Sequence, residues 1–363
     1  MTFDFHLSKT LQGLEGSIAA LAFSNDYRYL GSASQNGSGE GIVRIYDVEA
    51  QFQTFWSHRR PSQFGVINWD RDCRLIMGTV TGELLMISPK AQKLHAEPDV
   101  IHTFSSPIKS IEFNKYGNKM LICAGRDINV MEKTNANYSL QYLPVVVSSA
   151  HFLKDQRHSV IAFLHHGLWK INLESGHSQW IIYPENRIGG TAITPDCAVL
   201  ITAGSRKGLD CYSVSTDPWT KISTSLGREE LPITSNTYLP IRFMNRGRAA
   251  VMGTANGRAV IFNAEHGERI QTLLHSSDVM ISGLACHEEA LLIVTGNVDG
   301  KICVWVRGPL ESEQIPYLRS LVLVMTVPTV VTEYLRAHAM LILLVLAFML
   351  LPSSLQHDFL YLS

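Results

Sequence analysis

Two stretches of the sequence contain residue types that could do chemistry: the adjacent histidines His165 and His166, and the glycine-rich residues 37–41. Imidazole nitrogens are common metal ligands, and glycine-rich loops can cradle phosphate groups. Adjacent side chains in a strand point to opposite faces, so in a strand His165 and His166 could not converge on one metal ion. Residues 37–41 lack the Gly-Lys-Ser/Thr ending of a phosphate-binding loop, and no nucleotide-binding helix follows. We therefore expect an enlarged hairpin loop there.

The carboxylates and thiols form no catalytic pattern. Asp70, Asp72 and Asp127 fall in expected turns, where an aspartate side chain caps its own backbone. The six cysteines have no CxxC or CxxH spacing, and most fall in or beside strand patterns, where a free cysteine acts as a small hydrophobe. We predict no catalytic residue, no metal ligand and no cofactor.

The elements that would carry these residues form one pattern that occurs seven times. Each copy is an alternating strand, a polar turn, an apolar run, a glycine-containing turn and a third strand. The six steps from Phe23 to Ala285 cover 262 residues, about 44 per copy, which matches the roughly 40–45 residues of a four-stranded propeller blade. The bulky landmarks of the copies are Phe23, Trp69, Phe113, Phe152, Ile193, Phe243 and Ala285.

The turn residues support the same interpretation. Asn-Gly pairs at 36–37 and 256–257 supply the positive φ angles that tight hairpins need. Second strands such as residues 200–203 are continuous apolar runs, as expected for strands covered on both faces. Third strands are expected at 42–46, 83–87, 128–131, 168–171, 209–212, 258–262 and 301–305. Seven third strands predict seven blades.

The repeat resembles that of the WD40 family. The family's Trp-Asp dipeptide should close each third strand, and the corresponding pairs here are Tyr46-Asp47, Ile87-Ser88, Met131-Glu132, Ile171-Asn172, Tyr212-Ser213, Phe262-Asn263 and Trp305-Val306. The family's Gly-His ahead of each first strand is reduced to lone His58 and His275 before the second and seventh copies. The resemblance covers about residues 1–308 and implies an all-β, seven-bladed WD40-type propeller, divergent in its motif residues. It also implies a rigid platform for other proteins.

Ring closure needs an extra strand, because the seventh copy contains only three. Residues 3–10 alternate and can supply the outer strand of the last blade, which would remove the exposed edges of an open ring. Residues 321–332, rich in valine and threonine, are the alternative. We favour the N-terminal strand, because residues 13–16 connect it directly to the first blade.

Residues 309–363 form a tail of different composition. Residues 339–351 are uninterrupted apolar residues, and 335–355 would make a helix of about 31 Å, against a bilayer core of about 30 Å. Arg336 and His338 lie near one end, where their side chains could snorkel. A C-terminal transmembrane anchor is favoured. An apolar extension packed on the propeller and a gene-model artefact remain alternatives.

The net charge indicates which partners the protein can bind, and the N-terminal residues indicate where in the cell it is located. The formal net charge is −1, which argues against general nucleic-acid binding. The N-terminus contains Asp4 and His6 and has no long apolar core, so it does not resemble a signal peptide. We expect a cytoplasmic propeller, anchored to an intracellular membrane by its C-terminus.

The expected function is a non-catalytic protein–protein interaction scaffold. One alternative is a guanine-nucleotide exchange factor for a small GTPase in vesicle trafficking, similar to membrane-tethered propellers of that kind, with the loop 35–41 contacting the GTPase. A second alternative is a metal-dependent propeller hydrolase. The densest basic cluster, residues 58–60, is expected in an interblade loop. The candidate partner-binding residues are Asn36, Glu40, Phe55, Trp56, Arg59, Arg60 and Trp219, and the other large aromatics of expected surface loops are Trp180, Tyr183 and Tyr238. Each of these aromatics could equally be packed between blades, and for most of them we expect that packing.

Overall fold

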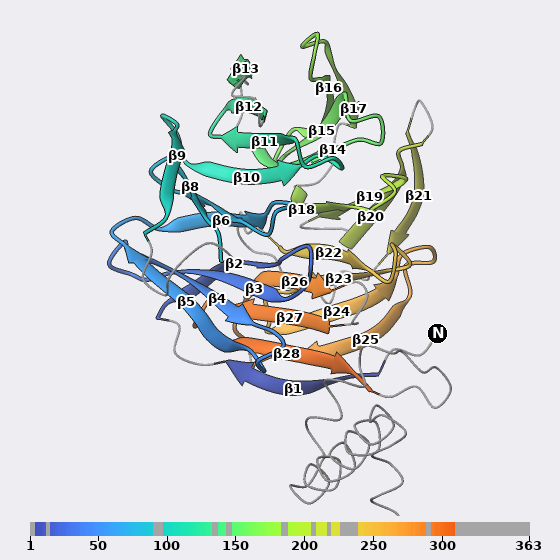
Figure 1. Ribbon diagram of the computed structural model, residues 1–363. Coiled ribbons are helices and arrows are strands. Elements are labelled where there is room, and N and C mark those ends of the chain that lie inside the picture. The colour runs from blue at the N-terminus through green and yellow to red at the C-terminus, as the bar shows by residue number, and fades with distance from the viewer. Residues whose placement is uncertain are drawn as a thin grey trace, which may run out of the picture. The chain divides into compact units, whose positions relative to one another are not determined.

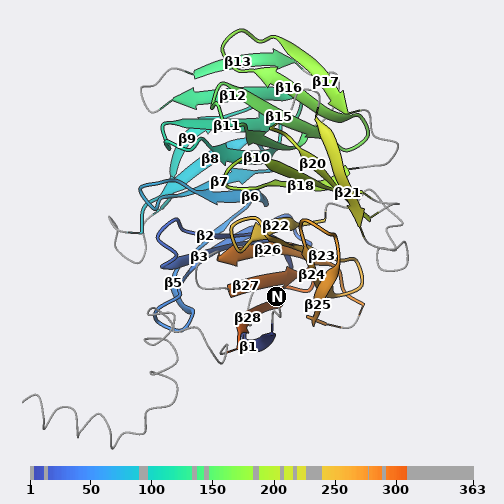
Figure 2. The same ribbon diagram turned by 90° about the vertical axis from the view of Figure 1, so that its right-hand side faces the viewer.

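The strands form seven four-stranded antiparallel sheets, which are the blades of a propeller (Figures 1 and 2). The computed structural model describes residues 4–11, 15–89, 97–132, 137–142, 147–182, 188–204, 208–215, 219–225, 239–276, 278–287 and 292–308. Over these residues all regular elements are strands, so the predicted all-β, seven-bladed fold is confirmed. Each third strand predicted from the turn pattern is present, within one or two residues of its expected bounds.

In blades 1 to 6 the four strands run from the axis outwards in chain order, and in blade 7 the N-terminal strand β1 is the outermost. Blade 1 contains β2 (Ser17–Phe23), β3 (Tyr29–Gln35), β4 (Gly41–Asp47) and β5 (Gln53–Arg60). Blade 2 contains β6 (Phe64–Trp69), β7 (Leu75–Thr79), β8 (Glu83–Ile87) and β9 (Asp99–Thr103). Blade 3 contains β10 (Ile108–Phe113), β11 (Lys119–Ala124), β12 (Asp127–Glu132) and β13 (Asn137–Tyr142). Blade 4 contains β14 (Val147–Phe152), β15 (His158–Phe163), β16 (Gly167–Asn172) and β17 (Ser178–Ile182). Blade 5 contains β18 (Ile188–Ile193), β19 (Val199–Gly204), β20 (Gly208–Ser213) and β21 (Thr220–Ser225). Blade 6 contains β22 (Ile241–Met244), β23 (Ala249–Gly253), β24 (Arg258–Asn263) and β25 (Arg269–Leu274). Blade 7 contains β26 (Ile281–His287), β27 (Leu292–Asn297), β28 (Ile302–Arg307) and β1 (Phe5–Leu11).

The ring is closed by the N-terminal strand. β1 pairs antiparallel with β28 and completes the seventh blade, and both views show it there (Figures 1 and 2). Gln271 of β25 reinforces this strand, because its side chain accepts a hydrogen bond from Phe5 N at 2.9 Å and donates one to Phe5 O at 2.8 Å. The N-terminal prediction is confirmed. The alternative that residues 321–332 fill the outer position of blade 7 is wrong, since β1 occupies it.

The core lies between neighbouring blades. Between blades 1 and 2, Val43 and Ile45 pack with Phe64 and Trp69, and all four are at most 5 % exposed. The Trp69 indole also donates to Ala22 O at 3.0 Å, which ties the two blades together. The second strands are apolar because both of their faces are covered in this way.

Blade 7 keeps a buried hydrogen-bond relay. The Thr295 hydroxyl lies 2.6 Å from His275 Nδ1 and accepts from Trp305 Nε1 at 2.9 Å. At the corresponding positions of blade 1 the hydroxyls of Ser32 and Tyr46 are buried, and neither has a hydrogen-bond partner among the described residues. Apolar packing therefore contributes a larger share of the stability of blade 1.

The predicted tail, residues 309–363, lies outside the described residues, and so does the candidate span 335–355. Across the residues described, no helix long and apolar enough to cross a membrane is present.

Candidate functional site

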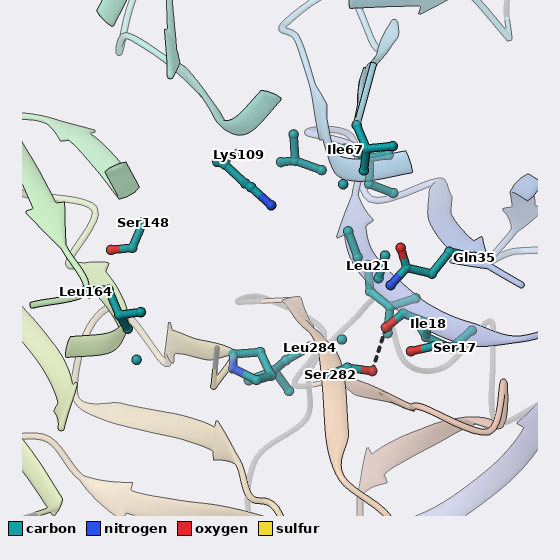
Figure 3. A pocket seen from close by; sticks show the side chains of 18 of the residues that line it. Ser17, Ile18, Leu21, Gln35, Ile67, Lys109, Ser148, Leu164, Ser282 and Leu284 are labelled. Carbon is teal, nitrogen blue, oxygen red and sulfur yellow. Dashed lines mark hydrogen bonds between the residues drawn. The ribbon is translucent and has the colours of Figure 1, made fainter. Parts of the chain in front are cut away.

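A cavity of about 780 Å³ opens on the axis of the ring (Figure 3). Its walls are the inner strands β2, β6, β10, β14, β18, β22 and β26, together with turns that follow second strands. All seven blades therefore contribute to one concave surface. A second cavity, of about 460 Å³, lies further along the same inner strands, towards their C-terminal ends.

Cationic side chains line the first cavity. Lys109 lies on β10, Arg126 in the turn between β11 and β12, and Arg242 on β22, while His165 and His166 lie in the turn between β15 and β16. All five are exposed, and no Asp or Glu occurs among the described residues that line the cavity. We call these five residues the cationic mouth. Their electrostatic field favours a negatively charged ligand.

The floor of the same cavity is apolar. Its partly exposed apolar residues are Val66 of blade 2, Leu164 of blade 4 and Met280 and Val298 of blade 7, and Lys109 extends its ammonium group towards the middle of the cavity (Figure 3). Polar groups that converge over an apolar surface are typical of binding sites. The cavity can therefore hold an apolar group and an anionic group of one ligand side by side.

Small hydroxyls in the wall are already bonded to the backbone. Ser282 donates to Ile18 O at 2.5 Å, and Ser148 donates to Ala162 O at 2.9 Å. These bonds hold blade 7 against blade 1 and β14 against β15, so the wall is pre-formed. The hydroxyls fix the shape of the cavity, and the cations supply its charge.

His165 and His166 correct one expectation. Their side chains would diverge in a strand, but β15 ends at Phe163 and β16 begins at Gly167, so both histidines lie in the turn. Gly167 has φ of +88°, a conformation that suits glycine and allows this longer connection. Both histidines line the same cavity. Nevertheless, the described residues contain no group of three or more His, Cys, Asp or Glu side chains that could hold a metal ion.

The second cavity contains a chain of polar groups that joins three blades. Thr191 Oγ1 lies 2.8 Å from His151 Nε2 and 2.6 Å from Ser149 Oγ, and His151 Nδ1 lies 3.8 Å from Glu112 Oε1. This order resembles a nucleophile, base and acid, but Thr191 is only 1 % exposed. A substrate could not reach its hydroxyl, so the chain serves as a bonded link between blades 3, 4 and 5. No sequence pattern predicts it, because its members come from three repeats and from different positions within them.

Three of the candidate partner-binding residues lie together at the loop between β3 and β4. Asn36 Oδ1 accepts from Glu40 N at 2.9 Å, and Asn36 Nδ2 donates to Glu40 Oε2 at 3.1 Å. Arg59 binds both Glu40 and Glu15, at 3.1 and 2.9 Å. The loop is the enlarged hairpin that the sequence predicts, and its charges are already paired with one another.

The other candidates lie elsewhere. Residues 58–60 form the end of β5 rather than an interblade loop, because β5 pairs with β4 as far as Arg60. Arg60 binds Glu83 of the next blade at 2.7 Å. Trp56, on the same strand, is 4 % exposed and packs in the core between blades 1 and 2, as expected from the alternative that these aromatics lie between blades.

The remaining aromatics are packed or not described. Phe55 is half-buried against the blade 1–2 core, and Trp219 is half-buried against the cluster that includes Leu168. Trp180 is a strand residue on β17, stacked on Trp169 with ring centroids 5.7 Å apart. Tyr183 and Tyr238 fall outside the described residues.

Of the aspartates expected in turns, Asp70 and Asp72 lie there and Asp127 does not. Asp70 Oδ1 accepts from the backbone of Asp72 and of Arg74, both at 2.9 Å. Asp127 begins β12 instead. Asp70 is therefore a structural residue of its turn.

Comparisons with known proteins give matches of limited extent. The family model described as WD domain, G-beta repeat matches residues 267–306, which cover β25 to β28 almost completely. Cilia- and flagella-associated protein 52 of Homo sapiens is 24 % identical over 188 residues, half of this chain, and its Mus musculus counterpart is 25 % identical over the same length. In both cases the match covers 29 % of the relative, so the chain spans less than a third of the proteins it resembles.

Proposed function

We propose that this chain, which is a divergent WD40-repeat protein with a seven-bladed propeller, is a non-catalytic protein–protein interaction scaffold that binds a partner at the cationic mouth. The observation that supports this most is the cavity of about 780 Å³, to which every blade contributes. A concave surface held by a closed ring loses little conformational freedom when it binds, so more of the contact energy remains as affinity.

The construction of the ring adds support. β1 joins the two ends of the propeller, and Gln271 secures it to blade 6. Blades that cannot separate keep Lys109 of blade 3 and Arg242 of blade 6 at a fixed separation across the cavity. A fixed arrangement of charges favours one partner over others.

The names of the relatives suggest a setting. The matched proteins are called cilia- and flagella-associated, and we extend that association to this chain as part of the proposal. Tagged full-length protein in ciliated cells should then concentrate along the cilium or at its base. A uniform distribution through the cytoplasm would contradict this part of the proposal and leave the scaffold role untouched.

A capture experiment with matched variants tests the scaffold role. Immobilised full-length protein is compared with Lys109→Gln/Arg242→Gln and with the control Lys115→Gln/Arg157→Gln, which removes the same charges from exposed turns between first and second strands. Wild type and control should retain the same saturable set of proteins from a ciliated-cell extract, and the mouth variant should lose it. Equal retention by all three would refute binding at this surface.

The membrane-tethered form of the proposal rests on residues 335–355. We expect the full chain to stay in carbonate-extracted membranes and a version ending at Gly308 to be released. Truncation there keeps the Gly308 N–H bond to Asp4 O, 2.7 Å long, so the closing strand stays in place. Release of both forms would exclude the tether.

Two other activities are testable alternatives. Replacing the loop 35–41 by a two-residue turn should abolish nucleotide exchange on a small GTPase if the chain is an exchange factor. Stoichiometric calcium or zinc in purified protein would favour a metal-dependent hydrolase. Among the described residues, nothing favours nucleotide exchange or metal-dependent hydrolysis over the scaffold function.

A further inference from the structure

We propose that the cationic mouth binds an acidic linear segment of a partner protein, whose carboxylates contact Lys109, Arg126 and Arg242 while an apolar side chain occupies the floor. This inference rests on the proposed scaffold function and specifies the chemistry of the partner.

The state of the cations is the first argument. Elsewhere on the propeller basic side chains bind carboxylates: Arg60 binds Glu83 at 2.7 Å, and Lys119 binds Glu132 at 2.9 Å. Lys109 and Arg242 form no ion pair with any carboxylate among the described residues. Since the formal net charge of the chain is −1, this accumulation is local and does not reflect an overall basic composition. A ligand with carboxylates would supply the missing partners.

The placement of the charges is the second argument. Lys109 and Arg126 belong to blade 3, whereas Arg242 belongs to blade 6, with two blades between them. They therefore face the cavity from different sides. Arg242 donates from Nη1 to Ile241 O at 2.9 Å, which uses one of the five guanidinium donors and leaves donors for a carboxylate. A segment that crosses the mouth can contact both blades at once.

The floor is the third argument, and it decides between classes of partner. The partly exposed side chains of Val66, Leu164, Met280 and Val298 offer apolar surface in the same cavity as the cations. A nucleic-acid backbone needs cations along a strip and has no aliphatic group for such a floor. An acidic peptide with a leucine-like residue matches both features.

The size of the cavity fits a short extended segment. A volume of about 780 Å³ falls within the roughly 300–1,000 Å³ of small-ligand sites. It can hold a few side chains but no folded domain. The remainder of the partner would then lie over the rim of the propeller.

Fluorescence anisotropy with the full-length chain tests the inference. The probe is a labelled peptide with the core Glu-Glu-Leu-Glu-Glu, and its counterparts replace every glutamate by glutamine or the leucine by glycine. We expect the glutamine peptide to bind roughly tenfold more weakly or worse, a loss of about 1.4 kcal/mol or more, because it can form no charge-assisted bond through a carboxylate. The glycine peptide should also lose affinity, and added salt should weaken the acidic peptide most.

Matched variants assign the binding to the mouth. Lys109→Gln/Arg242→Gln should bind the acidic peptide roughly tenfold more weakly or worse, while Lys115→Gln/Arg157→Gln should bind like wild type. All four side chains are exposed, so the unfolding midpoints of both variants should equal that of wild type, which checks their folding. Equal affinity of the two variants would overturn the inference.

Two further outcomes separate this inference from the proposed function. Tighter binding of a labelled thymidine oligonucleotide than of the acidic peptide, lost in the mouth variant, would overturn the acidic-peptide assignment in favour of nucleic acid. If the peptide does not bind while the capture experiment still distinguishes the mouth variant, the acidic specificity fails and the scaffold stands. If neither experiment distinguishes that variant, both proposals fail.

Discussion

His275 and Trp305 bind the same hydroxyl, that of Thr295, which lies 2.6 Å from His275 Nδ1 and 2.9 Å from Trp305 Nε1. The relay connects the entry to β26 with β27 and β28, inside the blade that β1 closes. It also lies in the segment 267–306 that the WD40 model matches. The blade that must hold the ring shut is therefore the one that keeps these polar contacts.

Thr295→Val should destabilise the propeller by about 1–3 kcal/mol, because it leaves the buried Trp305 N–H and the His275 nitrogen without their partner. Thr295→Ser is the matched control, since it retains the hydroxyl. Denaturant titration measures both. Equal midpoints for the two variants would show that the relay contributes nothing.

Stability should fall in mild acid. Burial lowers the pKa of His275 to about 4, with the charge of Lys301 adding to the effect, and burial lowers the pKa of His287 to about 4. Both histidines stay neutral in the folded state, whereas in the unfolded chain they bind protons below about pH 6.5. Their stabilising contribution is thus complete above that pH and is lost as the pH falls towards about 4.

Unfolding midpoints measured between about pH 7 and about pH 4 test this, and His287→Phe should show a smaller fall. Phenylalanine keeps an aromatic ring against Tyr27, whose ring centroid lies 3.5 Å from that of His287, and it does not titrate. The same pH dependence in His287→Phe would rule out a contribution of that histidine.

Gln271→Ala should weaken ring closure by about 1–2 kcal/mol, because it removes both hydrogen bonds to the Phe5 backbone. Amide hydrogen exchange should then rise in β1 before other strands. Gln179→Ala, on the outer strand β17, removes an exposed glutamine and serves as control. Exchange in β1 that matches the control would contradict the role of Gln271.

Arg59→Ala should change the free energy of unfolding by less than about 1 kcal/mol, because its ion pairs with Glu15 and Glu40 are solvent-exposed. Trp56→Ala, on the same strand, should cost about 3–5 kcal/mol, because it empties a buried site between two blades. Denaturant titrations compare the two. A larger loss for Arg59→Ala would invert this ranking.

The fold could be predicted because its signals are local. A period of about 44 residues and the Asn-Gly turns at 36–37 and 256–257 act within one repeat. The closing strand was also predictable, since the seventh copy contains one strand too few. That Trp56 is one of the buried aromatics could not be predicted from the sequence, because an outer strand and a loop have similar short patterns of aromatic and basic residues.

The cationic mouth could not be predicted in the same way. Lys109 and Arg242 are 133 positions apart, and the ring alone brings them to one cavity. Their repeats show no shared charge pattern, so no periodicity marks them. The sequence marks His165 and His166 as residues that could bind a metal, but the turn that places both at the cavity depends on where β15 ends.

Zero-length carbodiimide cross-linking of the acidic peptide to the full-length chain tests the central claim most directly, because it joins a carboxylate to an amine in contact with it. We predict that the first peptide adduct located by mass spectrometry is at Lys109, and that Lys115, equally exposed but in the turn between β10 and β11, remains unmodified. Adducts at Lys115 as early and as abundant as at Lys109 would contradict binding at the cationic mouth.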